Sequence, residues 1–308
     1  MIYTVTLSPA LDKSYTIPGF AAGKVNRVRE GRSDPGGKGI NVSKTIRALG
    51  GQSIAMGIAG GQTGRDILSR LDAMGIGHDF VSGRHETRTN IKISDPECGT
   101  TTDINEPARL EAGECEALLS RLLARLNPGD IVAIAGRIDT AACDIVDWIN
   151  QINEKQARVC LDTAGDALKK GIAAKPFIIK PNREEFEALL GSRCDTLDAL
   201  AQEAMRLSKE HQIGHVVVSL GEEGALFASG DAVLAASAPQ VRPVSTVGAG
   251  DAMCAALCFA IERGLEEAEG YRLALACGSA AVCCPGSQSP EKEKIEALLP
   301  LIEIRRIA

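Results

Sequence analysis

The sequence predicts an α/β fold in which helices cover both faces of a mostly parallel sheet. Short β-branched runs alternate along the chain with longer amphipathic stretches, an order typical of parallel sheets. The runs are almost continuously apolar, as expected of strands that are buried on both faces. The chain has 308 residues, 44% of them hydrophobic, which is enough to bury one large core. We therefore expect a single domain spanning residues 1–308.

The elements follow from these runs. The chain opens with a strand-like run at 2–7, and the clearest later strands are expected at 131–135, 158–162, 177–180 and 216–220. Helices are expected near 111–126, 141–152, 183–190 and 197–211. Ligands of such sheets bind at the carboxyl ends of the strands, so the loops after residues 7, 135, 162, 180 and 220 are expected to line the site.

Two segments, approximately 13–32 and 87–105, interrupt this alternation. Within them, residues 14–17, 25–30, 90–94 and 100–104 are strand-like, with little helix between. Four such strands can form a small sheet that stands apart from the main layer and exposes an apolar face. We expect this sheet to be a lid over a site, and the chain to form a homodimer through it.

Composition narrows the class of protein. No apolar run approaches the roughly 18 residues that span a bilayer, and the N-terminus lacks the pattern of a signal peptide. We expect a soluble, cytoplasmic protein without a membrane partner. The net charge of −6 argues against nucleic acid as a partner, because a phosphate-backbone binder normally carries a basic excess.

The ten cysteines are interpreted as reduced, because they are scattered through a chain far longer than a disulfide-stapled scaffold. A helical environment of Ala and Leu surrounds Cys254, Cys258, Cys277, Cys283 and Cys284. A thiol in such a place behaves as a small buried hydrophobe. Packing is favoured over metal binding, because the sequence shows no Cys-x-x-Cys pair or His-containing ligand cluster.

A glycine-rich block ending in a carboxylate is the strongest local signal. Residues 245–251 read Ser-Thr-Val-Gly-Ala-Gly-Asp, and a helical run at 252–262 follows at once. Backbone N–H groups at a helix N-terminus attract an anion such as a phosphate. Asp251 would then lie beside the phosphate, where a carboxylate can accept a hydroxyl proton. Taken alone, the block is equally compatible with a tight turn and an ordinary helix-start carboxylate.

A second block, residues 34–42, lies far upstream. Its glycines, including Gly37, allow close backbone approach, while Lys38 and Asn41 supply a cation and an amide suited to a polyol phosphate. The block is not a Walker A loop, because position 32 is Arg and Gly39 replaces the metal-binding hydroxyl. No complete Gly-x-Gly-x-x-Gly fingerprint is present, which disfavours a dinucleotide site.

With these motifs the chain resembles the PfkB carbohydrate kinases, especially the branch of 1-phosphofructokinase and tagatose-6-phosphate kinase. The resemblance runs nearly end to end and rests on seven ordered blocks at 6–12, 36–41, 87–92, 104–107, 179–185, 218–221 and 248–251. It implies a ribokinase-like αβα core with a β-sheet lid, and ATP and Mg²⁺ as ligands. It also implies that Asp251 is the catalytic base and that Gly248, Ala249 and Gly250 form the anion hole for the γ-phosphate.

The resemblance implies two sets of binding residues. For the sugar phosphate they are Asp12, Gly37, Lys38, Asn41, Arg88, Asn90, Lys92 and Asn105, with Arg27 reaching a neighbouring subunit's site. For the nucleotide they are Lys180, Asn182, Ser219, Gly221, Gly224, Thr246, Gly248, Gly250 and Gly278. Asn182 and Glu185 resemble an Asn-x-x-Glu element that orders magnesium, often through water. Each basic residue alone would be interpreted as a solvated lid side chain, and the Asn182 segment alone as an N-capped helix.

The sequence departs from the family pattern in two places. Ser8 stands where the branch usually has Asn, and residues 136–139 read Gly-Arg-Ile-Asp where the family has Gly-Ser-Leu-Pro. Arg137 therefore replaces a phosphate-binding serine, and an arginine could supply a bidentate contact instead. We expect ATP-dependent phosphorylation of a ketohexose phosphate, with fructose 1-phosphate as the leading acceptor.

Three alternatives stay open at this point. The acceptor could be tagatose 6-phosphate, fructose 6-phosphate or an unphosphorylated sugar. The chain could be a sugar-phosphate sensor that kept the fold and lost turnover, as the replaced serine suggests. A nicotinamide-linked oxidoreductase is disfavoured by the missing fingerprint.

Overall fold

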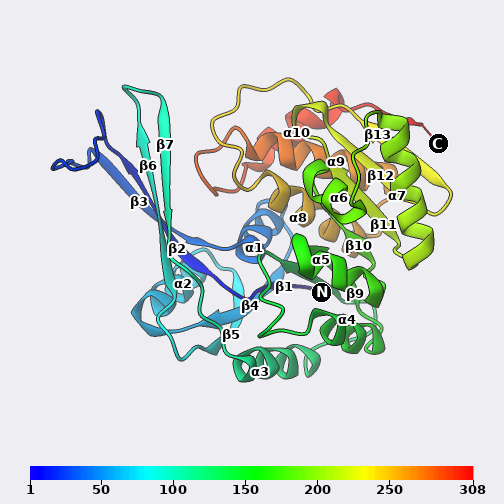
Figure 1. The fold of residues 1–308 in the computed structure, drawn as a ribbon, viewed down its shortest axis with the longest axis horizontal. Helices are drawn as coiled ribbons and strands as arrows, with labels where there is room; N and C mark the ends of the chain where they lie inside the picture. Colours follow the sequence, from blue (N-terminus) through cyan, green and yellow to red (C-terminus); the bar gives the residue numbers. More distant parts are fainter. Residues whose placement is uncertain (308) are drawn as a thin grey trace.

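The computed structural model describes residues 1–307 of the chain, which contain one large and one small sheet (Figure 1). The large sheet runs, in spatial order, through β14 (Ile304–Arg306), β13 (Ala232–Ala236), β12 (Ala225–Ser229), β11 (His215–Ser219), β10 (Ile178–Ile179), β9 (Arg158–Asp162), β8 (Ile131–Ala135), β1 (Ile2–Thr6), β4 (Ser53–Ala59) and β5 (Gly77–Ser82). Neighbours from β5 to β11 pair in parallel, and β12, β13 and β14 add antiparallel strands at one edge. The predicted mostly parallel sheet is confirmed.

Helices cover both faces of this sheet. One layer consists of α3 (Ala112–Leu123), α4 (Ile145–Glu154), α5 (Gly165–Gly171), α6 (Arg183–Leu190) and α7 (Leu197–His211). The other consists of α1 (Lys38–Ala48), α8 (Ala249–Arg263), α9 (Glu267–Ala281) and α10 (Lys292–Leu298). Short 3₁₀ turns lie at Ile172–Ala174, Gly221–Glu223 and Leu299–Leu301. Because strand side chains alternate, Val5 of β1 packs in the core beneath the layer of α3 to α7, and Ile2 packs in the core beneath the layer of α1, α8, α9 and α10.

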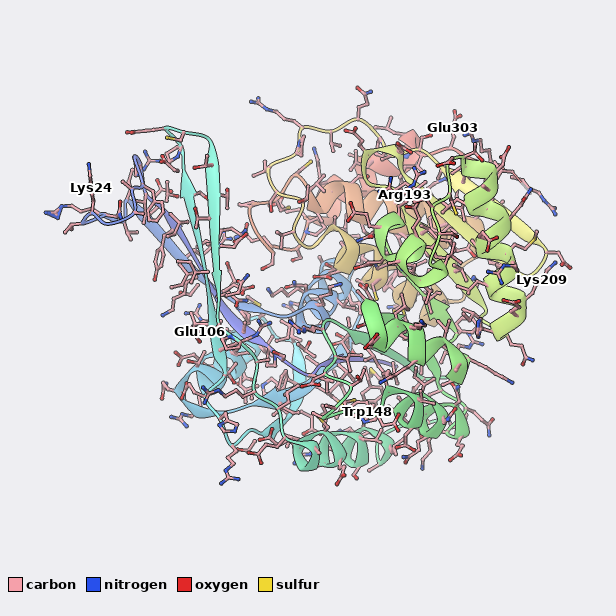
Figure 2. All side chains as sticks on the ribbon, in the orientation of Figure 1. Lys24, Glu106, Trp148, Arg193, Lys209 and Glu303 are labelled. Atoms are coloured by element: carbon pink, nitrogen blue, oxygen red, sulfur yellow. The ribbon has the colours of Figure 1, made fainter. Side chains whose placement is uncertain are left out.

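The small sheet projects from one end of the core as the predicted lid (Figure 1). Its strands, in spatial order, are β3 (Glu30–Gly36), β2 (Ala10–Thr16), β6 (Arg88–Asp95) and β7 (Thr100–Asn105). Helix α2 (Gly61–Ala73) packs at the base of the lid, where Ile67 and Leu71 meet Leu11 of β2 and Ile40 of α1. Lys24 lies at the far tip of the loop between β2 and β3 (Figure 2).

One predicted lid strand is wrong. Residues 25–30 belong mainly to the connecting loop, where Val25 is 88% exposed, and the strand begins only at Glu30. Pairing with β2 decides this, because its register runs from Thr16 opposite Glu30 to Ala10 opposite Gly36. The paired segment contains glycine, proline and aspartate, so its local β-propensity is low and tertiary pairing overrides it. The other three predicted lid strands, at 14–17, 90–94 and 100–104, are confirmed.

Smaller differences concern element ends. The helix expected from 141 begins at Ile145, because the Asp144 side chain accepts hydrogen bonds from the N–H groups of Val146 and Asp147. Cys283 and Cys284 were expected inside a helix, but α9 ends at Ala281 and both lie partly buried in the turn that follows. None of the helices within residues 1–307 has the length and apolarity that crossing a bilayer requires.

Candidate active site

A cavity of about 400 Å³ lies where the N-terminal ends of α1 and α8 meet the base of the lid. Residues from both glycine-rich blocks line it, together with residues of the lid and of the loop after β8. Its polar side chains include Lys38, Asn41, Arg88, Asn90, Arg137 and Asp251. Two motifs that are far apart in the sequence thus open onto one cavity.

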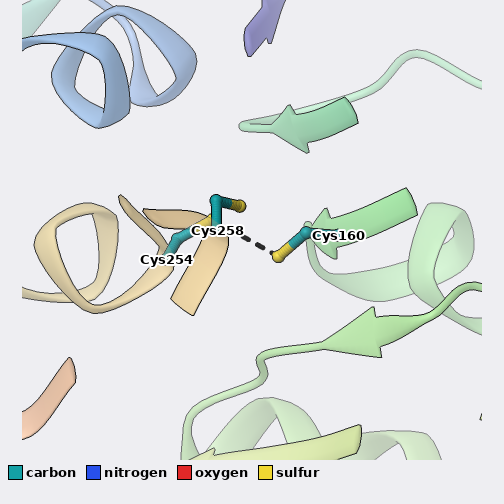
Figure 3. A group of neighbouring side chains, drawn as sticks. All are labelled: Cys160, Cys254 and Cys258. Carbon is teal, nitrogen blue, oxygen red and sulfur yellow. Dashed lines mark hydrogen bonds between the residues drawn. The ribbon is translucent and has the colours of Figure 1, made fainter. Parts of the chain in front are cut away.

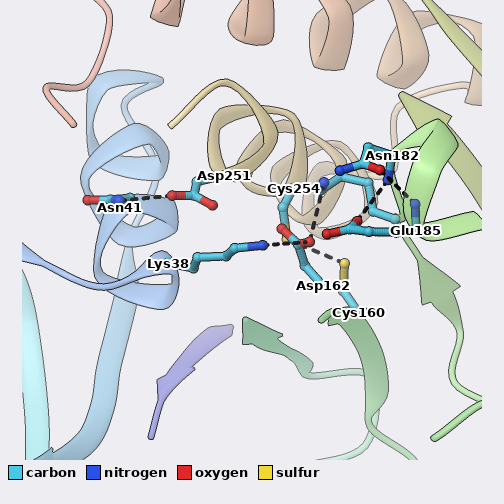
Figure 4. A network of polar contacts seen from close by, with 9 residues as sticks. Lys38, Asn41, Cys160, Asp162, Asn182, Glu185, Asp251 and Cys254 are labelled. Atoms are coloured by element: carbon cyan, nitrogen blue, oxygen red, sulfur yellow. Dashed lines mark hydrogen bonds and ion pairs between the residues drawn. The ribbon is translucent and has the colours of Figure 1, made fainter. Parts of the chain in front are cut away.

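Asp251 lies in the first turn of α8 and is 6% exposed. Asn41 Nδ2 donates a hydrogen bond to its Oδ2 at 2.8 Å (Figure 4). Burial and the nearby negative charge of Asp162 raise the pKa of Asp251 to about 6. The Asn41 hydrogen bond and the positive charges of Lys38 and Lys180 act in the opposite direction. A carboxylate of this kind is largely ionised at pH 7 and is more basic than an ordinary aspartate, as a general base requires.

The start of α8 can hold an anion next to Asp251. Gly248 is the N-cap residue with φ = 84°, a left-handed conformation that favours glycine. The N–H groups of the first helical turn have no partner within the helix, and the helix dipole adds positive potential there. Lys180 Nζ lies 3.1 Å from the position that a Cβ atom on Gly250 would take. Glycine at 250 therefore leaves room between the helix end and this ammonium group.

Asp162, which the sequence analysis did not select, organises two lysines at the same end of the sheet. Its Oδ1 atom lies 3.3 Å from Lys180 Nζ and 3.5 Å from Lys38 Nζ (Figure 4). The carboxylate raises the pKa of Lys38. Burial alone would lower the pKa of Lys180, but Asp162 and the other negative groups around it, including Asp251, together more than offset burial and the pKa is raised. Both lysines therefore remain cationic.

Asp162 also has an open acceptor. Its Oδ2 atom and the hydroxyl of Thr163 are buried and find no hydrogen-bond partner within residues 1–307. Buried polar atoms of this kind are completed by bound water, an ion or a ligand. Asp162 is the last residue of β9, and the loop after this strand was predicted to line the site. This position was the signal that could have identified Asp162.

Three thiols lie directly behind these charges. Cys160 of β9 and Cys254 and Cys258 of α8 have Sγ atoms within 4.8 Å of one another, and the first two are 3.5 Å apart (Figure 3). The sequence showed no ligand cluster because the thiols come from two distant elements. Contact with Cys160, together with burial, raises the pKa of Cys254 well above its ordinary value. All three thiols are buried, as predicted for Cys254 and Cys258, and the preference for packing over metal binding stays a prediction.

The Asn182–Glu185 pair forms a capping box at the start of α6. Asn182 Oδ1 accepts from the Glu185 N–H at 2.8 Å, and Glu185 Oε2 accepts from the Asn182 N–H at 2.9 Å. The other oxygen of the Glu185 carboxylate, Oε1, takes no part in the capping box, and the negative charge of Glu185 helps to raise the pKa of Lys38. Together with the open oxygen of Asp162, these oxygen donors suit a hard cation such as Mg²⁺ held partly through water.

The predicted nucleotide loop follows β11. Ser219 forms an isolated β-bridge with Asn182, which joins this loop to the capping box. Gly221 has φ = 62° and open space around it, whereas a Cβ atom on Gly224 would lie 1.9 Å from the carbonyl oxygen of Ala236. Thr246 is exposed in the loop before α8.

Gly278 lies apart from this loop, within α9. It is buried against α8, where an added Cβ atom would lie 2.8 Å from Met253 Cγ. Close packing of two helices therefore accounts for this glycine.

The lid supplies the opposite wall of the cavity. Asn90 Nδ2 donates to Asp12 Oδ1 at 2.9 Å, and burial raises the pKa of Asp12. Arg88 donates to the backbone oxygens of Ser8 and Glu106, both at 3.3 Å. Arg88 Nε and Asn90 Oδ1 are buried without a partner in the described chain. Both residues line the cavity, and their unused donor and acceptor are chemically suited to a polyol phosphate.

Lys92 and Asn105, which were predicted for this cavity, are not among the residues that line it, and Arg27 was predicted for a neighbouring subunit's site. Lys92 forms an ion pair with Asp103, with 2.6 Å between Nζ and Oδ1. Asn105 is exposed at the end of β7, opposite Asn90 in the register, and Arg27 is exposed in the tip loop.

Comparison with known proteins adds independent findings. The model of the pfkB family carbohydrate kinases matches residues 6–294. The 1-phosphofructokinase of Bacillus subtilis (strain 168) is 33% identical over 309 residues, covering 100% of both chains. The structure of phosphofructokinase-2 from Escherichia coli in complex with substrates and products superposes with a TM-score of 0.91 at 28% identity, covering 97% of this chain and 98% of the other. Ribokinase from Thermotoga maritima shares the fold, with a TM-score of 0.77 at 22% identity and coverage of 97% and 99%.

Proposed function

Because the chain belongs to the pfkB family of carbohydrate kinases, we propose that it transfers the γ-phosphate of ATP to a hydroxyl group of fructose 1-phosphate, giving fructose 1,6-bisphosphate and ADP. The name of the Bacillus subtilis relative supports this acceptor. The observation that carries the proposal is the shared cavity, in which the Asp251 carboxylate lies beside a helix N-terminus and opposite lid residues with unfilled hydrogen-bonding atoms.

In the proposed reaction Asp251 accepts the proton of the sugar hydroxyl. The hydroxyl oxygen forms a bond to the γ-phosphorus of ATP, the bond from that phosphorus to the bridging oxygen breaks, and its electron pair remains on ADP. The N–H groups of Ala249 and Gly250 and the ammonium group of Lys180 face the charge of the transferred group. Closure of the lid excludes water, which would otherwise accept the phosphate.

Asp162, Glu185 and Asn182 supply the oxygen donors that would hold Mg²⁺, partly through water. When bound with ATP it neutralises phosphate charge. The nucleotide itself would lie along the loop that contains Ser219, Gly221 and Gly224.

Arg137 supports a phosphorylated acceptor. It lines the cavity together with Arg88, and the charge of Arg137 contributes to lowering the pKa of Arg88, after the larger effect of burial. Two guanidinium groups on one cavity suit a doubly charged phosphate ester, which they can bind bidentately. Arg137 thus takes the place of the serine that other family members use.

An ADP-release assay against fructose 1-phosphate, tagatose 6-phosphate, fructose 6-phosphate and fructose tests the proposal. We expect the highest kcat/KM with fructose 1-phosphate, and NMR of the product should show two phosphate esters. A higher kcat/KM for another sugar would mean that this sugar is the acceptor, while the proposed type of reaction would stand. Thermal stabilisation by a sugar phosphate without any ADP would instead identify a sensor.

The role of Arg137 is tested by two variants in the same assay. Arg137→Ala should lower kcat/KM for fructose 1-phosphate by roughly 10- to 30-fold, which corresponds to one charge-assisted hydrogen bond. For fructose, which has no phosphate, the change should be small. Arg137→Ser, which restores the usual hydroxyl, should recover part of the loss. An equal loss of kcat/KM for both sugars would show that Arg137 does not contact the acceptor phosphate.

We also propose that two copies associate through the lid. Val25, Val28 and Ile104 are 88%, 50% and 52% exposed there, and a second copy seated on the lid would cover them. Analytical ultracentrifugation should give a dimer for the unmodified chain and a larger monomer fraction for Ile104→Asp. A monomeric unmodified chain would contradict this assembly.

A further inference from the structure

A buried lysine lies behind the Asn41–Asp251 pair. Lys44, one helical turn after Asn41 on α1, is 7% exposed. Its Nζ atom donates to Asn41 Oδ1 at 3.2 Å, while Asn41 Nδ2 donates to Asp251 Oδ2 at 2.8 Å. The three side chains therefore form a continuous chain of hydrogen bonds that ends at the carboxylate.

The ammonium group determines which way the Asn41 carboxamide points. A carboxamide presents an acceptor on one side and two donors on the other. In the observed orientation its oxygen meets the lysine and its nitrogen meets the carboxylate. The flipped orientation would place two oxygens together at Asp251 and two donors together at Lys44. Because the site is buried, that mismatch would be costly.

Lys44 also belongs to a wider group of charges. It faces Asp12 of β2, Asp34 and Arg32 of β3, and Asp251 of α8. Burial lowers the pKa of Lys44 to about 8, the three carboxylates act against this decrease, and Arg32 adds to it. Lys44 is thus mostly cationic at pH 7 and becomes neutral as the pH rises above about 8.

A second cavity also borders this lysine. This cavity of about 1070 Å³ is larger than the candidate active site and is bordered by Lys44, Asp34 and Arg47. None of the residues around it lines the site cavity. Lys44 thus lies between this second cavity and the Asn41 side chain that lines the site.

We propose that Lys44 is a positioning residue for phosphoryl transfer, which fixes the Asn41 carboxamide and thereby holds Asp251 ionised and directed at the sugar hydroxyl. The inference rests on the proposed function for its effect on turnover. Its effect on Asp251 itself does not depend on which substrate is phosphorylated.

The first test observes the Asp251 carboxyl group directly. The chain is labelled with ¹³C at the aspartate carboxyl carbons, and the resonance of residue 251 is assigned by its absence in Asp251→Asn. Lys44→Met should shift the titration of this carboxyl to higher pH, because a nearby positive charge is lost. An unchanged titration midpoint would overturn the proposal. This readout needs no turnover, so it decides the inference even if no sugar phosphate is a substrate.

The second test measures turnover. Lys44→Met should lower kcat by ~10-fold, the scale of a misplaced general base, with little change in KM for ATP. Lys44→Arg should retain most of the activity. In the unmodified chain kcat should decline above pH 8 as Lys44 loses its proton, and this decline should be absent in Lys44→Met. In an Asn41→Ala background, Lys44→Met should have little further effect, because Lys44 acts through Asn41. An equally large effect in both backgrounds would overturn the proposal.

Controls separate positioning from folding. Arg47→Met removes an exposed cation from the same helix and the same cavity, and it should leave kcat and the pH profile unchanged. If Lys44→Met does not fold, Lys44→Gln and Lys44→Arg decide the matter by the same measurements. Loss of the folded state in all three variants would assign Lys44 a purely structural role and overturn the proposal. Absence of ADP release by the unmodified chain with every sugar phosphate would instead contradict the proposed function.

Discussion

The two walls of the site cavity differ in how deeply their side chains are buried. On the core wall, Asp251 and Asn41 are 6% and 8% exposed and hydrogen-bond to each other, and Lys180, which is 4% exposed beside Gly250, pairs with Asp162. On the lid wall, Arg88 and Asn90 are only partly buried and keep unused hydrogen-bonding atoms. The core-wall side chains are therefore more deeply buried than those of the lid wall, while both sides of the site keep unused hydrogen-bonding atoms, Asp162 Oδ2 among them.

This difference separates two kinds of contribution to catalysis. Groups that are fixed in advance around the transferred phosphate stabilise the transition state, so they should determine kcat. Groups that hold the acceptor equally in the ground state and the transition state should determine KM. Substitutions on the two walls should consequently give different kinetic signatures.

The largest effect is expected on the core wall. Asp251→Asn should lower kcat by at least ~10², because the variant keeps the shape of the side chain but cannot accept the proton. KM for ATP and for the sugar phosphate should change little. Near-normal turnover in steady-state assays would exclude Asp251 as the base and remove the distinction between the two walls.

The same variant should be more stable than the unmodified chain at pH 8. The raised pKa of Asp251 means that its ionised form is disfavoured in the folded protein, so ionisation costs stability as the pH rises through about 6. Removing the charge should return on the order of 2–3 kcal/mol at pH 8. Urea unfolding should show the advantage shrinking between pH 6 and pH 4. A loss of stability at pH 8 would mean that the drop in kcat reflects misfolding.

On the lid wall, Arg88→Met should mainly weaken binding. Loss of a charged contact to the acceptor phosphate is expected to raise KM for the sugar phosphate by roughly 10- to 30-fold, with kcat within about 3-fold of the unmodified value. Arg84→Met, which removes an exposed cation paired with Glu111, is the matched control and should change neither constant. A large fall in kcat with unchanged KM would show that Arg88 stabilises the transition state and does not merely bind the acceptor.

The pH dependence of the reaction reports the core wall alone. Only ionised Asp251 accepts a proton, so kcat should fall below pH 6 and reach about one-tenth of its plateau at pH 5. The acceptor phosphate titrates in the same range, so the profile is repeated with fructose, which lacks it. Arg88→Met should keep the same acid limb. A limb that moves with this lid substitution would show that the two walls are electrostatically coupled.

The sequence predicted the local motifs of the core wall more completely than the residues that distant elements bring to it. The Gly-Ala-Gly-Asp block and the upstream Lys38–Asn41 segment are local patterns, since glycines and a helix start determine where their side chains point. Asp162 and Lys44 were missed for a shared reason. Their surroundings are created by elements that are distant in the sequence, such as β9 beside Lys180 and α1 beside β3.

The lid shows the same limit for strands. Three of its strands followed from β-branched runs, but β3 contains the sequence Glu-Gly-Arg-Ser-Asp-Pro-Gly and is a strand only because β2 pairs with it. The register of that pairing also places Asp12 opposite Asp34, which no local pattern indicates. Long-range pairing thus defines both the lid and the charges next to Lys44.

The smallest effect should come from Lys92, which separates the lid as a structure from the lid as a binding wall. Lys92 pairs with Asp103 on the neighbouring strand, and its side chain is 26% exposed. A partly exposed ion pair contributes at most about 0.5 kcal/mol, so Lys92→Gln and Asp103→Asn should reduce stability equally and slightly. KM for the sugar phosphate should rise by no more than about 3-fold in Lys92→Gln, well below the effect of Arg88→Met. If KM instead rises by as much as in Arg88→Met, Lys92 must leave Asp103 and contact the acceptor when the lid closes. The lid wall would then include Lys92, which does not line the cavity in this structure.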